Sequence, residues 1–123
     1  MNTFMNETTL DLVNAEITKF NNAASKCDTV FGSKFNLLRR IMERNLDNIM
    51  SNVWSAERVG YLTHDEAVGV YGDIERIKAD AVGRFRMAEQ ERVGETEYTI
   101  RWIQHCRRCT REEAEAEYKE WDE

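Results

Sequence analysis

The residues best suited to chemistry in this 123-residue chain lie in the sequence HCRRC at positions 105–109. Cys106 and Cys109 have the C-x-x-C spacing that lets two thiolates bind one zinc ion when two further ligands complete a tetrahedron. The other candidate ligands are Cys27 and His64, and neither belongs to a second C-x-x-C or to a spaced pair of histidines. We therefore predict no metal and no other cofactor, with the cysteines packed as small apolar residues. A zinc site made of these four residues is the alternative.

Catalytic motifs are absent from the sequence. His64 is the one candidate general base outside that segment, but no nucleophile or carboxylate can be placed beside it from the sequence. Phosphate-binding glycine loops, the nucleophile elbow G-x-S-x-G and the zinc-protease motif H-E-x-x-H do not occur. A redox role for Cys106 and Cys109 would need a preceding strand, and no strand pattern is present. We expect that the protein is not an enzyme.

Arginines alternate with aromatic residues just before the C-terminal tip. This pattern is typical of surfaces that stack nucleotides or single-stranded nucleic acid. A small-molecule or nucleotide-binding helical oligomer is therefore one alternative function, and nucleic-acid binding is a second, less favoured one because the chain has no basic excess. The glutamates that follow favour a different outcome, in which the arginines form ion pairs across a helical hairpin. The residues concerned are Tyr98, Arg101, Trp102, Arg107, Arg108 and Arg111.

The C-terminal tip carries the entire net charge of the chain. Its last twelve residues hold seven carboxylates and one lysine, which accounts for the net charge of −6. A helix dipole disfavours negative charge at a C-terminus, so this position calls for an explanation. One is a solubilising last turn. The other is a surface that binds a basic region of another protein, with aromatic anchors and a charged rim. The residues predicted for that surface are Glu113, Glu117, Tyr118, Glu120 and Trp121.

The elements that must position these residues are helices. The chain has no proline, and apolar residues recur every three or four positions over residues 7–26, 34–58, 64–93, 96–109 and 110–123. Thr63 with Glu66, and Thr110 with Glu113, have capping-box spacing, and Ser33 is a candidate N-cap. We predict an all-α fold of four to five helices in a single domain. Residues 1–94 would form an antiparallel three-helix core and residues 95–123 a C-terminal helical hairpin.

Three glycines lie within the third predicted helix, at Gly69, Gly72 and Gly83. A glycine inside a helix costs up to about 1 kcal/mol relative to alanine. We expect close packing against another helix of the chain to explain that cost. The alternatives are a ligand, a second copy of the chain in a homodimer, or a break in the helix near Gly72.

The composition of the chain indicates its cellular compartment. No stretch approaches the 18 apolar residues of a membrane span, and no signal peptide precedes the first helix. Three cysteines, an odd number, favour a reducing compartment, so we expect a cytoplasmic protein. The leading hypothesis is a small regulator or inhibitor that occludes a partner protein. Its small size, its lack of catalytic motifs and its acidic tip are typical of the modulators that phages and mobile elements direct at host proteins.

Overall fold

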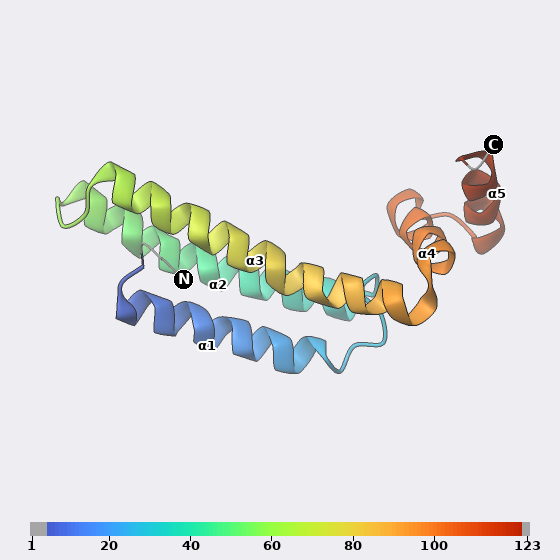
Figure 1. The fold of residues 1–123 in the computed structure, drawn as a ribbon, viewed down its shortest axis with the longest axis horizontal. Coiled ribbons are helices and arrows are strands. Elements are labelled where there is room, and N and C mark those ends of the chain that lie inside the picture. The colour runs from blue at the N-terminus through green and yellow to red at the C-terminus, as the bar shows by residue number, and fades with distance from the viewer. Residues whose placement is uncertain (1–4, 122–123) are drawn as a thin grey trace.

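The computed structural model describes residues 5–121, which form five α-helices and no strand (Figure 1). The helices are α1 (Glu7–Ala24), α2 (Ser33–Arg58), α3 (His64–Val93), α4 (Glu95–Arg107) and α5 (Arg111–Trp121). The predicted all-α class, with an antiparallel core and a C-terminal hairpin, is confirmed.

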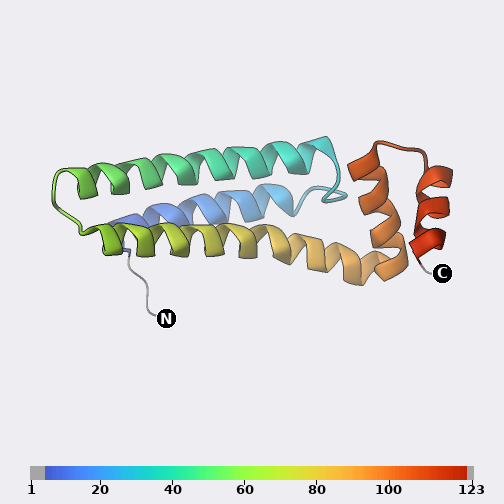
Figure 2. The ribbon, with the colours of Figure 1, turned by 90° about the horizontal axis from the view of Figure 1, so that it is seen from above.

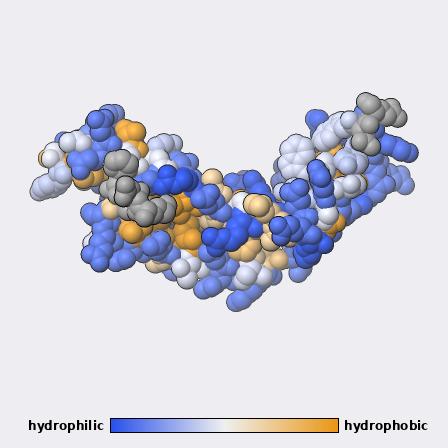
Figure 3. Space-filling model, in the orientation of Figure 1, coloured by the Kyte–Doolittle hydropathy of each residue, from blue (hydrophilic) through white to orange (hydrophobic). Residues whose placement is uncertain are grey.

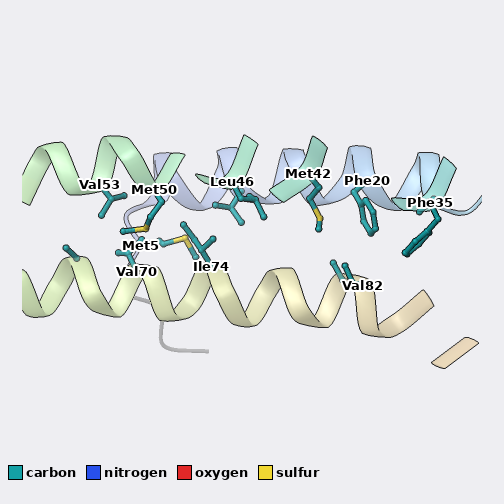
Figure 4. Close-up of a cluster of buried hydrophobic side chains, with 14 residues drawn as sticks. Met5, Phe20, Phe35, Met42, Leu46, Met50, Val53, Val70, Ile74 and Val82 are labelled. Atoms are coloured by element: carbon teal, nitrogen blue, oxygen red, sulfur yellow. The ribbon is translucent and has the colours of Figure 1, made fainter. Parts of the chain in front are cut away.

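Helices α1, α2 and α3 lie side by side as an elongated antiparallel bundle (Figures 1 and 2). Across the bundle interior, Leu46 of α2 faces Ile74 of α3, and Met42 lies nearer Val82 (Figure 4). Near the α1–α2 loop, the rings of Phe20, Phe35 and Phe85 contact one another edge to face, with centroids 5.7–6.0 Å apart. The apolar stripes read from the sequence therefore meet in one continuous core.

The helix starts follow local capping chemistry. Asn6 caps α1, because its side-chain oxygen accepts a hydrogen bond from the Thr9 amide at 2.8 Å. Thr63 and Glu66 form the predicted capping box, with both hydrogen bonds at 3.1 Å. The prediction that Ser33 caps α2 is wrong, since Ser33 is the first helical residue and Gly32 occupies the N-cap.

Helix α3 is continuous over 30 residues, so the predicted alternative of a break near Gly72 is wrong. The expectation that backbone packs closely on the glycines is also wrong at Gly72 and Gly83. Apart from neighbouring backbone of the same helix, a Cβ placed on either residue would meet no atom within 4 Å. The other residues of this long helix keep it intact despite the low helix propensity of glycine at these two positions.

Helices α4 and α5 form a hairpin that runs across one end of the bundle (Figures 1 and 2). Gly94, with φ of +91°, allows the sharp change of direction between α3 and α4. The hairpin has a small core of its own, formed by Ile100, Ile103 and Ala114. Within the described part of the chain, α4 packs against α3, whereas α5 packs against α4 alone.

Candidate binding surface of the C-terminal hairpin

Ion pairs join the two helices of the hairpin. Glu97 of α4 accepts hydrogen bonds from Arg111 at 2.7 Å and from Arg101 at 3.0 Å. These bonds, chiefly the one from Arg111, lower the pKa of Glu97 to about 2. Arg107 pairs with Glu117 of α5 at 3.0 Å. The predicted pairing of an arginine with the tip glutamates across the hairpin is thus confirmed for Arg107, whereas Arg111 pairs across the hairpin with Glu97, which lies outside that cluster.

Tyr118 lies inside the hairpin rather than on an outer face. Its half-buried ring packs on the cluster of Ile100 and Ile103. Its hydroxyl is 3.3 Å from the Thr96 hydroxyl oxygen. Tyr118 therefore holds α5 on α4, and the aromatic group that α5 presents to solvent is Trp121.

Trp121 contacts Trp102 of α4, with ring centroids 6.4 Å apart. The two residues nevertheless remain 52% and 45% exposed, respectively. Single exposed apolar side chains are common at protein surfaces, but adjoining exposed rings form contiguous apolar surface, which is what marks an interaction site. The sequence placed these two tryptophans in different hypothetical sites, whereas the fold brings them together.

Carboxylates flank this pair along α5. Glu113, Glu117 and Glu120 recur at helical spacing before Trp121, which places them on one side of the helix. Glu113 and Glu120 are exposed. Glu117 is half-buried and forms an ion pair with Arg107. We call these three glutamates together with Trp102 and Trp121 the docking face. Asp122 and Glu123, the last acidic residues of the predicted tip, lie outside the described residues.

The alternative ligand-binding residues do not form a single site. Tyr98 and Trp102 line a small cavity, while Arg101 lines a separate cleft of about 610 Å³ with Gln104 and Cys109. Arg107 is bonded to Glu117, as described above. Arg108 ends α4 in a left-handed conformation with φ of 53° and is exposed.

The structure shows which arginines accompany Tyr98 and Trp102 in the small cavity. They are Arg39 of α2 and Arg86 of α3. Sequence analysis missed both, because no local pattern links residues that lie on three different helices.

The candidate zinc ligands are not brought together. Cys106 is exposed, and Cys109 packs on the small core of the hairpin. His64 begins α3 at the opposite end of the bundle (Figure 1), where its Nδ1 shares a hydrogen bond with Glu57. Over residues 5–121, no three His, Cys, Asp or Glu side chains gather in a metal-binding arrangement.

The surface seen in Figure 3 is mostly hydrophilic over the hairpin, and apolar side chains gather over the bundle. None of the helices described is long and apolar enough to cross a membrane. Comparisons with protein-family profiles, with curated proteins and with solved structures found no match.

Proposed function

We propose that this protein is a non-enzymatic protein-binding regulator whose docking face occludes a basic surface of a partner protein. The observation that carries the proposal is the half-exposed pair of Trp102 and Trp121 beside a row of carboxylates. Tryptophan is enriched among the residues that dominate binding energy at protein interfaces. An aromatic centre with a charged rim is the usual anatomy of such a surface.

Charge favours a basic partner. Glu113 and Glu120 have no cationic side chain within 4.0 Å among the residues described. Lys119 is the single basic residue that follows Arg111, so the negative potential along this side of α5 is little compensated. Complementary charge of this kind accelerates association and selects partners more than it adds affinity.

The shape of the molecule suits occlusion. The hairpin lies at one end of an elongated bundle, and α5 lies on the side of α4 away from the bundle (Figures 1 and 2), so a large partner can approach the docking face without meeting the bundle. This regulatory role needs no chemistry within the chain. We propose that it is exercised in the cytoplasm, where the three free cysteines would stay reduced, and that the protein belongs to the phage- or mobile-element-type modulators of host proteins.

Site-specific photo-crosslinking tests this proposal. A photoreactive amino acid would replace Trp121 in one variant and Tyr61 in another, and crosslinked proteins would be identified in cells that make the chain. Tyr61 is a matched control because it is an aromatic residue, 85% exposed, in the α2–α3 turn at the far end of the bundle. We expect one dominant partner with a basic surface at position 121 and not at position 61. Equal crosslinking at both positions would contradict the assignment.

A further inference from the structure

A small cavity opens where α2, α3, α4 and the α1–α2 loop meet. Its volume is about 130 Å³, which corresponds to roughly four water molecules at liquid density. Hydrogen-bond donors line it from three helices: Arg39 and Asn36 of α2, Arg86 of α3 and His105 of α4. Carboxylates are absent from its lining among the residues described.

Arg86 is the strongest feature of this cavity. Within the described residues its guanidinium group has no carboxylate within 4.0 Å and donates no hydrogen bond. Arg86 is exposed, so its N–H groups are hydrated and can exchange water for a ligand. Its charge also acts on Tyr98, whose pKa is raised by burial, the largest effect, and lowered in part by Arg86. An unpaired arginine beside aromatic rings is arranged to receive an anion.

Arg39 is held in place beside it. Its guanidinium donates to Glu43 at 2.9 Å and to the Asn36 side-chain oxygen at 2.7 Å. Three of its N–H groups remain unused, and the Asn36 oxygen is turned toward Arg39, which leaves the amide nitrogen of Asn36 able to donate. The geometry of this arginine is thus fixed before any ligand arrives, which lowers the entropic cost of binding.

The neighbouring larger cleft is a poorer anion site, although Arg92 and Arg101 line it. Glu89 lies 3.6 Å from Arg92 and 3.8 Å from Arg101. Glu97 also pairs with Arg101, at 3.0 Å. Both arginines of the larger cleft are therefore already partly neutralised, whereas in the small cavity Arg39 is paired with Glu43 and Arg86 has no carboxylate partner within 4.0 Å among the described residues.

Aromatic side chains complete the cavity. The Phe31 ring contacts Tyr98 at 5.2 Å and His105 at 5.6 Å between centroids, which forms one wall. Trp102 lies at the cavity and is 45% exposed, so one part of its ring system remains open to a planar group. The cavity has room for a phosphate group but not for a nucleobase as well, so the base must lie outside it.

We propose that this cavity binds the phosphate of a nucleoside monophosphate between Arg86 and Arg39, with the base stacked on Trp102. Base stacking on an aromatic side chain and phosphate binding by arginine are the two contacts that such a ligand requires. This site does not rest on the proposed protein-binding function, although the two share Trp102.

The test is a titration followed by NMR of the 15N-labelled protein. AMP, adenosine and inorganic phosphate would be added separately, each up to about 10 mM, a range that detects millimolar affinity. We expect AMP to shift the indole signal of Trp102 and the backbone signals around Arg86, with an affinity about 10-fold or more above those of adenosine and phosphate. No saturable shift with AMP, or equal affinity for AMP and phosphate, would overturn the proposal.

Matched variants locate the site. Arg86→Gln should weaken AMP binding about 10-fold or more, because a charge-assisted contact is lost. Arg84→Gln, at an equally exposed position of the same helix that does not line the cavity, should leave it unchanged. Trp102→Ala should reduce the affinity for AMP to that for phosphate. Equal effects of the two arginine substitutions in folded proteins would contradict the assignment to this cavity.

Discussion

Glu89 should be the most consequential charged residue for stability, and replacing it with alanine tests the packing of the α1–α2 loop. The residue is only 4% exposed. One carboxylate oxygen accepts from the Val30 amide at 2.9 Å, and the other accepts from the Thr29 hydroxyl at 2.9 Å. A single carboxylate of α3 therefore fixes the loop that connects α1 to α2.

The expected cost follows from these two bonds. A hydrogen bond to a charged group contributes about 1.5–3 kcal/mol. Thr29 and Val30 are half-buried, so water can replace part of what is lost. The nearby cations Arg92 and Arg101, at 3.6 and 3.8 Å, are partly exposed and add little. We expect Glu89→Ala to lower the free energy of unfolding by about 3 kcal/mol, the lower end of the range for two such bonds.

Urea unfolding followed by far-ultraviolet circular dichroism measures this difference. Glu89→Gln keeps the volume and one acceptor oxygen, so it should cost roughly half as much. Glu91→Ala removes an exposed carboxylate from the same helix and should change the free energy of unfolding by less than about 0.5 kcal/mol. The reasoning would be refuted if Glu89→Ala cost no more than the Glu91 control.

Three further predictions concern the hairpin and α3. The pKa of Glu97 falls from 4.5 to about 2 in the folded protein, so its contribution to stability is complete above about pH 4.5 and is lost as the pH falls toward 2; the protection factors of hairpin amides, which correct hydrogen exchange for its intrinsic pH dependence, should fall over that range, and unchanged protection factors would contradict the role of Glu97. Gly72→Ala should raise the free energy of unfolding by about 0.5–1 kcal/mol, because a Cβ there meets no atom within 4 Å; thermal unfolding measures this, and a lower melting temperature would show that the position is not open. Tyr118→Ala should release α5 from α4, since Tyr118 supplies the largest ring in the hairpin core; the Ala114 amide should lose its protection from hydrogen exchange while Leu46, buried in the bundle, keeps it, and full protection of both would refute this role.

The features that could be predicted from the sequence, such as the helices and the start of α3, depend on residues close together along the chain. The helices were readable from apolar spacing, and the start of α3 from the capping box of Thr63 and Glu66, because both signals act within one or two turns. The exposed and buried sides of the last helix were not resolved for Tyr118 and Trp121. The helix is short and weakly amphipathic, so its orientation depends on packing against α4.

The residues that sequence analysis missed are those that depend on contacts between distant segments. Arg39 and Arg86 line one cavity with Trp102 only because three helices converge at one end of the bundle. Glu89 did carry a signal, since it continues the four-residue spacing of Ala81 and Phe85 on the buried side of α3. A carboxylate at an apolar position of a helical stripe indicates a buried polar contact.

The affinity of the crosslinked partner for matched alanine variants tests the central claim most directly. Purified partner would be titrated with the unaltered protein and with the Trp121→Ala and Tyr61→Ala variants. We predict that Trp121→Ala weakens binding about 30-fold, the equivalent of a 2 kcal/mol interface hot spot, and that Tyr61→Ala leaves binding unchanged. An affinity that survives the loss of Trp121 would contradict the account of the docking face.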